Sequence, residues 1–435
     1  MTAIRVLVVD DSVVIRPLVT DALATDPRVE VVGTASDGRR ALARVEQLNP
    51  DVVTMDVEMP DMDGIEAVRA LRASGSRVPI IMFSTLTERG AAATLDALVA
   101  GASDYVTKPS NMGSVQESIA RVGDELVPKI LALAAGSSGG GRGRLGSRAD
   151  AGLPGAGGAS YGAGSARYGA GSGSVPFAGT SAGAGRASTG SGGPGGGVAS
   201  RPLGLAHAVP VGSGVPRAAA PPPPPPPPHA VRLVVVGSST GGPQALSTLV
   251  SALTAAPRVP VVVVQHMPPV FTHQLAARLD RLGPARVSEA QDGEELRAGH
   301  VYVAPGGEHL LVRNVRGVLR AVLDQGAPVN FCKPSVDVMF ASAVEAVGGD
   351  LVCAVLTGMG ADGRNGAGAI VRAGGTVVAQ DEATSVVWGM PGAVTTSGYA
   401  HRVLPLEAIP EALEAAVAAG APAAAARVPL TGGTR

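Results

Sequence analysis

Short apolar runs alternate with stretches of helical period in the first quarter of the chain. The runs lie at 5–9, 29–34, 51–55 and 79–83, and the segments between them repeat apolar residues every three or four positions. Strands separated by helical crossovers are typical of a parallel sheet. We therefore expect an N-terminal α/β domain with a doubly wound sheet.

The same alternation returns in the C-terminal half. Apolar runs lie at 232–236, 260–264, 301–304, 351–356 and 376–379, and helices are expected to begin near Pro243, Pro269, Ser335 and Gly363. The stretch 310–322 differs, because two short apolar runs flank an Arg-Gly pair, which favours an antiparallel hairpin. The second domain is thus predicted to be α/β with a mixed, largely parallel sheet and a β-hairpin.

Between the two domains the sequence is dominated by Gly, Ala, Ser and Pro. Such a segment cannot bury enough apolar surface to offset its conformational entropy. We expect a flexible coil followed by a polyproline II spacer that starts at Pro221, with a ligand for a proline-recognition domain as the less favoured reading. The predicted boundaries are 1–134 and 231–420 for the domains, 135–230 for the disordered linker and 421–435 for a flexible tail.

Charge and composition limit the classes of partner and location. The 435 residues include 35 basic and 36 acidic ones, so no net field attracts nucleic acid or an anionic membrane. The apolar runs are far shorter than the roughly 20 residues of a membrane span, and the N-terminus lacks the features of a signal peptide. Cys332 and Cys353 have no metal-ligand spacing and are expected to be reduced core thiols, which favours a cytoplasmic protein without membrane insertion.

Acidic residues follow the predicted N-terminal strands. Asp10 and Asp11 end the first strand and Asp56 ends the third, so a parallel sheet would gather them at one edge. Mg²⁺ prefers a few carboxylate oxygens supplemented by water and phosphate oxygens. Ser84 ends the next strand and Lys108 follows the fifth, where each could stabilise an acyl phosphate. The pattern describes an aspartate that accepts a phosphoryl group, although acids at strand ends also cap turns and helices.

The motifs VVDDS, MDVEMPDMDG, FST and YVTKP stand in the order and spacing of the response-regulator receiver family, which residues 1–134 resemble. The resemblance implies a five-stranded, flavodoxin-like fold and a histidine kinase of the chemotaxis type as phosphodonor. It also implies phosphorylation at Asp56 and a Mg²⁺ site made by Asp10, Asp11, Asp56 and the Glu58 carbonyl. Ser84, Tyr105 and Lys108 would sense the phosphate; a partly buried aromatic residue remains the alternative for Tyr105.

A glycine-rich turn, GSSTGG at 237–242, follows the first C-terminal strand. One reading is a phosphate-binding loop at a helix N-terminus, but the turn has neither the G-x-G-x-x-G pattern nor a Walker lysine. The other is a G-x-S-x-G turn that presents Ser239 as nucleophile, with the Thr240 N–H near the oxyanion.

A base and an orienting acid are expected at the same sheet edge. His266 follows one predicted buried strand and Asp362 follows another, whereas His309 lies beyond a Pro-Gly-Gly turn and is less well placed. Ser239 would attack, His266 would accept and return its proton, and Asp362 would fix the imidazole tautomer. The order Ser, His, Asp differs from that of α/β-hydrolases. The alternative reads the three residues as a helix cap, a core histidine and a turn former.

Six motifs in residues 231–420 are similar to the protein-glutamate methylesterase domain of the CheB family: GSSTGG, QHMP, VYVAPGGEHL, KPSVDVMF, LTGMGADG and SVVWGMPGAV. The resemblance implies the Ser239, His266 and Asp362 triad, an oxyanion contact from the Met359 N–H and no cofactor for the esterase. It implies demethylation of glutamate methyl esters, and deamidation of glutamines, on the cytoplasmic helices of methyl-accepting chemoreceptors. The unphosphorylated receiver would inhibit the esterase. A non-enzymatic adaptor that binds receptors, and a nucleotide-binding domain, are the rival hypotheses.

Overall fold

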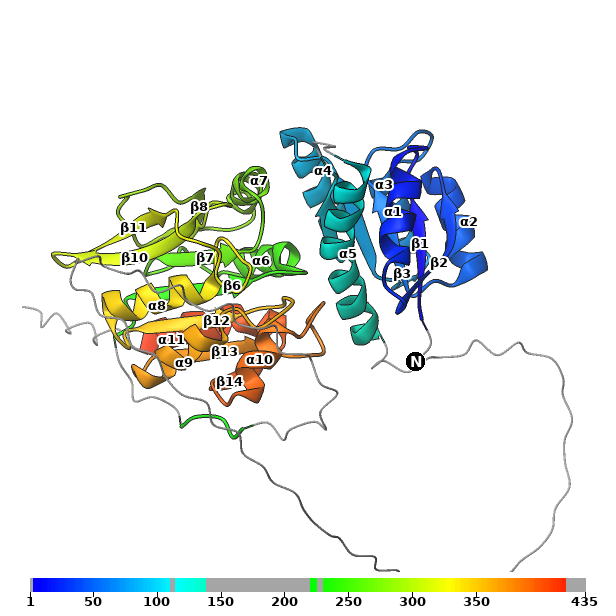
Figure 1. Ribbon diagram of the computed structural model, residues 1–435. Helices are drawn as coiled ribbons and strands as arrows, with labels where there is room; N and C mark the ends of the chain where they lie inside the picture. Colours follow the sequence, from blue (N-terminus) through cyan, green and yellow to red (C-terminus); the bar gives the residue numbers. More distant parts are fainter. Residues whose placement is uncertain (1–2, 110–113, 138–219, 225–229, 420–435) are drawn as a thin grey trace, which may run out of the picture. The chain divides into compact units, whose positions relative to one another are not determined.

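The computed structural model describes residues 3–109, 114–137, 220–224 and 230–419 (Figure 1). Most of the predicted linker, and the predicted tail, lie outside these residues.

The N-terminal sheet has five strands, and every pairing among them is parallel. Their order is β2-β1-β3-β4-β5. The bounds are β1 (Ile4–Val9), β2 (Val29–Ala35), β3 (Val52–Asp56), β4 (Ile80–Ser84) and β5 (Asp104–Thr107). This is the doubly wound order predicted from the alternating pattern, with the chain reversing its direction of growth between β1 and β3.

Five helices cover this sheet: α1 (Ile15–Ala24), α2 (Gly38–Leu48), α3 (Gly64–Ala73), α4 (Glu88–Val99) and α5 (Val115–Ser137). α1 packs beside α5, while α2 packs on α3 and α3 on α4, so the two groups cover opposite faces. Asp63 begins α3 with a reciprocal capping box to Glu66, which satisfies two backbone donors that a helix start leaves free.

The C-terminal sheet has seven strands in the order β14-β13-β12-β6-β7-β9-β8. The bounds are β6 (Leu233–Ser238), β7 (Val261–Gln265), β8 (Arg286–Glu289), β9 (His300–Val303), β12 (Leu351–Val355), β13 (Thr376–Gln380) and β14 (Arg402–Leu404). The first strand, β6, lies between β7 and β12, so the strand order reverses at the centre of the sheet. Ligands of open α/β sheets bind at the carboxyl edge of such a reversal.

Helices lie on both faces of this sheet: α6 (Gly242–Ser251), α7 (Pro269–Leu279) and α11 (Ile409–Ala419) on one, and α8 (Val336–Val347), α9 (Arg364–Arg372) and α10 (Met390–Thr396) on the other (Figure 1). Successive residues of β6 pack alternately into the two cores, Leu233 and Val235 into one and Val234 into the other. A strand that is buried on both faces explains the continuous Val-rich run in the sequence.

The predicted hairpin is formed by β10 (His309–Val315) and β11 (Val318–Asp324), which pair antiparallel. Arg316 and Gly317 have φ values of 54° and 89°, as a two-residue type I′ turn requires. The hairpin does not join the main sheet, in which every described pairing is parallel. The sequence predicted a mixed sheet, and this detail of the prediction is wrong. The reason is that buried Leu310 and Val312 direct β10 onto α8.

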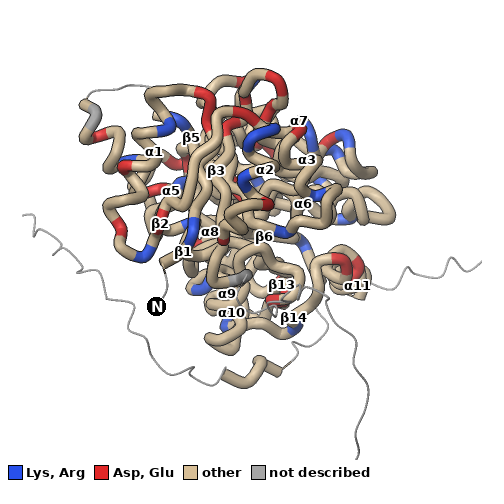
Figure 2. Tube along the Cα trace, turned by 90° about the vertical axis from the view of Figure 1, so that its right-hand side faces the viewer, with Lys and Arg blue, Asp and Glu red and all other residues tan. Residues whose placement is uncertain are grey.

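Two properties of the described residues bear on partners. Lys and Arg are interspersed with Asp and Glu along the chain (Figure 2). No helix among the described residues is long and apolar enough to cross a membrane.

Candidate functional sites

The acids at the N-terminal sheet edge form one cluster. Asp10 and Asp56 are buried, Asp11 is exposed, and one carboxylate oxygen from each lies within 4.8 Å of the others. The Lys108 ammonium lies 2.7 Å from Asp56 Oδ2 and 3.0 Å from Asp10 Oδ2. Four of the five residues that the sequence singled out at these strand ends thus lie together.

The electrostatics of this cluster suit a divalent cation. Burial raises the pKa of Asp56 to about 6, although the Lys108 ammonium acts in the opposite direction. The buried Asp10 Oδ2 is paired with Lys108 but makes no aligned hydrogen bond to any described residue. Crowded carboxylates that line an open pocket are a donor set that fits Mg²⁺.

The predicted phosphate-sensing residues differ in their surroundings. Ser84 and Glu58 line the same open pocket as Asp11, Asp56 and Lys108. The Ser84 hydroxyl, however, donates to the Gly90 carbonyl of α4 at 3.2 Å. Tyr105 is buried on β5, where burial raises the pKa of its hydroxyl well above the usual value.

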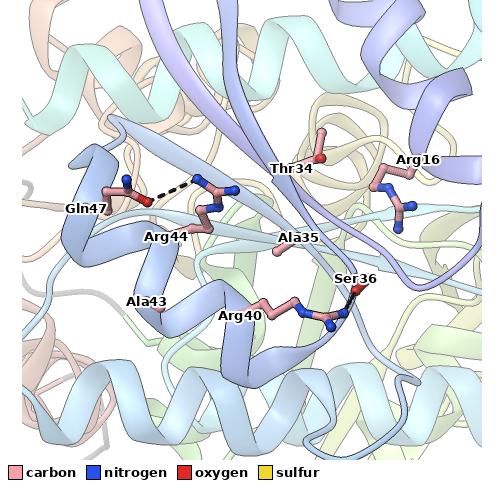
Figure 3. Close-up of a pocket in the computed structure, with 8 residues that line it drawn as sticks. All are labelled: Arg16, Thr34, Ala35, Ser36, Arg40, Ala43, Arg44 and Gln47. Atoms are coloured by element: carbon pink, nitrogen blue, oxygen red, sulfur yellow. Dashed lines mark hydrogen bonds between the residues drawn. The ribbon is translucent and has the colours of Figure 1, made fainter.

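A second pocket of this domain contains three arginines that were not predicted as functional residues (Figure 3). Arg16 donates to the Asp10 carbonyl at 2.7 Å, Arg40 to the Ser36 hydroxyl, and Arg44 to the Gln47 side chain. Each guanidinium thus has at least one partner on the chain, and we assign this pocket no ligand.

Ser239 stands on the turn between β6 and α6. Its N–H donates to the Thr357 carbonyl at 3.0 Å, and its carbonyl accepts from the Gln265 amide at 2.9 Å, so that the backbone is fixed on both sides. The adjacent Ser238 is fully buried and its hydroxyl donates to Gln265 at 2.7 Å. Of the two serines, Ser239 is therefore the one with an accessible hydroxyl.

His266 and Asp362 are hydrogen-bonded, with 2.9 Å between Nε2 and Oδ2. They follow β7 and β12, the two strands that flank β6. The Ser239 hydroxyl makes no hydrogen bond to the His266 ring in the part of the chain that the structure describes. The other ring nitrogen, Nδ1, lies 3.6 Å from Cys332 Sγ.

The Asp362 carboxylate is held by several donors besides His266. Oδ1 accepts from the Asn330 amide and the Ser335 hydroxyl, each at 2.9 Å. At the start of α8, the backbone N–H of Val336 donates to Oδ2 at 2.7 Å and that of Asp337 donates to Oδ1 at 3.1 Å. A helix N-terminus favours a negative charge, so the carboxylate is stabilised in its ionised form.

The pKa values of the pair reflect these contacts. Burial opposes the charge on Asp362, but the hydrogen bond from His266 and those from Asn330 and Val336 lower its pKa to about 2. Burial also opposes a charge on His266, yet the hydrogen bonds with Asp362 and Cys332 raise its pKa to about 9. The structure therefore favours an imidazolium beside a carboxylate.

His309, the less favoured histidine, has a different environment. It is buried, its Nδ1 accepts from the Ser335 N–H at 3.1 Å, and its Nε2 faces the Ala327 carbonyl at 3.0 Å. Both nitrogens are thus used to hold the loop that carries Ser335. His309 supports the Asp362 environment and is not available as a base.

The two predicted oxyanion donors are backbone groups near Ser239. Among the described residues, the Thr240 and Met359 N–H groups make no hydrogen bond to the chain. Backbone donors are nearly always paired in folded proteins, so two unpaired donors beside a serine are consistent with binding of a ligand oxygen.

Sequence reasoning missed Asn330 and Cys332 as members of this site. They lie on the loop before α8, more than 60 residues from His266, and no strand end places them there. The expectation that Cys332 is a core thiol is wrong, because Cys332 is only partly buried; Cys353 is fully buried as expected.

A parallel receiver sheet with an acid cluster, followed by an α/β domain with a hydrolase-like constellation, defines a response regulator with a catalytic output domain. Comparison with family models matches the response regulator receiver domain at residues 6–120 and the CheB methylesterase at residues 234–413. The chain belongs to the CheB methylesterase family.

Two relatives, matched over most of their length, agree with this assignment. The protein-glutamate methylesterase/protein-glutamine glutaminase of Nocardioides sp. is 51% identical over 406 residues, which is 93% of each chain. The protein of the same name from Symbiobacterium thermophilum is 41% identical over 417 residues, 96% of this chain and 98% of its own. The crystal structure of the Thermotoga maritima CheB methylesterase catalytic domain is 45% identical, covers 43% of this chain and 98% of its own, and has a TM-score of 0.42.

Proposed function

We propose that the chain is a phosphorylation-activated serine hydrolase that demethylates glutamate methyl esters on methyl-accepting chemoreceptors and deamidates receptor glutamines. The main support is the His266–Asp362 pair beside the Ser239 turn, in a chain whose relatives carry the name methylesterase/glutaminase. The reaction class, acyl transfer to a serine, follows from those three residues together with the two unpaired backbone donors.

In the acylation step, the Ser239 hydroxyl attacks the carbonyl carbon of the substrate and its proton passes to His266. Asp362 accepts the Nε2–H, so Nδ1 is the nitrogen that carries the lone pair for this transfer. The Thr240 and Met359 N–H groups stabilise the oxyanion. His266 then returns the proton to the leaving group, which departs as methanol from an ester or ammonia from an amide.

In the second step, water attacks the acyl-serine with His266 again as base, and glutamate is released. Catalytic hydrogen bonds are often absent or long without substrate and shorten only in the complex. We therefore expect the Ser239 hydroxyl to approach Nδ1 when the receptor helix binds.

The receiver site would control this chemistry. We propose that Asp56 accepts the phosphoryl group from a histidine kinase of the chemotaxis type. Asp10, Asp11, Asp56 and the Glu58 carbonyl would hold a Mg²⁺ ion, which when bound offsets the charge of the carboxylates and the phosphate. Lys108 would pair with the phosphate. Ser84 and Tyr105 would change their packing when Asp56 is phosphorylated, and this change would relieve the inhibition of the esterase. The proposed location is cytoplasmic.

The test is methanol release from methylated receptor membranes, measured with Mg²⁺ and an acyl-phosphate donor. Ser239→Ala should reduce the rate by about 10³-fold or more, as loss of a triad nucleophile does. Ser238→Ala is the matched control, since this neighbouring hydroxyl is buried against Gln265; it should keep most of the activity. Undiminished release by Ser239→Ala would exclude the triad, and no release by the wild type would favour a non-enzymatic adaptor.

A further inference from the structure

Cys332 places a thiol against the imidazole of His266. Its Sγ lies 3.6 Å from Nδ1, and one ligand atom each from His266, Cys332 and Asp362 lies within 4.8 Å of the others. The catalytic scheme above assigns no role to this sulfur. A thiol, an imidazole and a carboxylate from three separate loops are the donor types of a zinc site.

The spacing of the sulfur and nitrogen suits one shared ion. With a Zn–S bond of about 2.3 Å and a Zn–N bond of about 2.05 Å, a tetrahedral angle separates the two donors by roughly 3.6 Å. The separation of Sγ and Nδ1 is 3.6 Å. A zinc ion could thus be held without movement of either element.

The loop around Cys332 is already fixed. The N–H and carbonyl of Cys332 both pair with Val329, at 2.9 and 3.1 Å, and the two residues between them have φ values of 52° and 63°. Cys332 is partly buried and the His266 side chain is 13% exposed, so neither side chain is sealed from solvent. Little conformational entropy would be lost when an ion binds.

Asp362 would support the site as an outer partner. Its two oxygens already accept hydrogen bonds from Asn330, Ser335 and the α8 backbone, and its Oδ2 holds Nε2 of His266. Metal-binding histidines commonly donate their second ring N–H to a carboxylate, which orients the ring. The Asp362–His266 pair reproduces that arrangement, with Nδ1 directed at the thiol.

We infer that Cys332 and His266 form an inhibitory binding site for Zn²⁺. Binding converts the thiol to a thiolate, displaces the proton that Nδ1 carries in the imidazolium, and releases both protons to solvent. The ion then occupies the Nδ1 lone pair that would otherwise accept the Ser239 proton. Two protein ligands are fewer than the three or four that hold a resident zinc ion, and therefore the ion is a reversible inhibitor and not a resident cofactor. The predicted inhibition by Zn²⁺ depends on the proposed esterase function, whereas the predicted binding of Zn²⁺ does not.

The first experiment measures methanol release by the full chain with Mg²⁺ and an acyl-phosphate donor over a series of buffered free Zn²⁺ concentrations. Each variant is normalised to its own rate without zinc. Cys332→Ala should raise the half-inhibitory Zn²⁺ concentration by at least about tenfold, since even loss of an outer partner weakens metal binding by about that factor. Cys353→Ala, the matched control at the other cysteine, should stay as sensitive as the wild type. A zinc-selective chelator that leaves Mg²⁺ in place should restore activity.

The second experiment detects binding without turnover. Co²⁺ is added in place of Zn²⁺, and the thiolate-to-cobalt charge-transfer absorption is recorded. The band should appear in the wild type, in Cys353→Ala and in the inactive Ser239→Ala, and disappear in Cys332→Ala. Equal zinc sensitivity of Cys332→Ala and wild type, or a band that persists in Cys332→Ala, would overturn the site. A normal band in a wild type without esterase activity would instead overturn the proposed function alone.

Discussion

At the scale of single residues, Asp362 joins several parts of the C-terminal site through hydrogen bonds. It holds the His266 ring, and it also accepts from Asn330, Ser335 and the first N–H groups of α8. The hydrogen bond between the two side chains lowers the pKa of Asp362 and raises that of His266, and Cys332 raises the pKa of His266 further. The charge state of the proposed base therefore depends on this carboxylate and on the Cys332 thiol.

Asp362→Asn should change both the rate and its pH dependence. Only neutral His266 can accept the Ser239 proton, so with a pKa of about 9 the wild-type kcat/KM should rise with pH until that value is passed. The amide removes the negative charge that raises this pKa, and the rising limb should move to lower pH. The maximal rate should fall by about 10⁴-fold.

The measurement is kcat/KM for methanol release against pH, with wild type and Asp362→Asn in the same phosphorylating conditions. Asp337→Asn is a useful comparison, because Asp337 accepts from Gly366 and Asn330 without touching His266. An unchanged acidic limb in Asp362→Asn would contradict the assignment of His266 as the titrating group.

At the scale of helices and strands, most of the framework was predictable from the alternation of apolar residues. The strands that position Asp56, Ser239, His266 and Asp362 are long enough and apolar enough to be read from sequence. The short β8 and β14 were not predicted, because neither carries a strong apolar run. The hairpin was predicted, but its packing on α8 depends on tertiary contacts that periodicity does not encode.

The turn after Ser239 offers a test at this scale. Gly241 has a φ of 77°, and a Cβ there would lie 2.6 Å from the Val386 side chain. Gly241→Ala should lower the free energy of unfolding by more than the roughly 1–2 kcal/mol of the backbone conformation alone, because it also forces Val386 away. Esterase activity should fall as the Ser239 turn shifts.

Gly293→Ala is the matched control for this substitution. Gly293 has a nearly identical φ of 75°, and a Cβ there would meet nothing within 4 Å. The substitution therefore measures the cost of the backbone conformation alone. Urea unfolding and methanol release, measured on both variants, should show the larger loss of stability and of activity in Gly241→Ala. Equal destabilisation, with full activity in both, would show that the close approach to Val386 does not matter.

At the scale of the whole molecule, two sites at the carboxyl edges of two parallel sheets are joined in one chain. Each lies where the strand order reverses, between β1 and β3 in one domain and around β6 in the other. The proposed coupling makes the esterase rate a readout of the Asp56 phosphate.

Asp56→Asn should abolish stimulation of the intact chain by an acyl-phosphate donor with Mg²⁺, while the unstimulated rate remains. The amide cannot form an acyl phosphate, and the catalytic residues are untouched. Methanol release with and without donor measures this directly, and Asp51→Asn, an acid of the same domain that only supports Arg5, is the control. Stimulation that survives in Asp56→Asn would mean that another residue is the acceptor or that the donor acts elsewhere.

The hydrogen bonds of Asp362 to the start of α8 also bear on how such a chain could change over evolutionary time. A residue that is needed for both turnover and folding stays under selection for stability even after turnover is no longer selected. The Ser239 hydroxyl makes no hydrogen bond to any described residue and so has no comparable structural role there. A descendant that kept only the signalling role would accordingly lose the serine first and retain the aspartate, so the aspartate alone is a poor marker of an active enzyme.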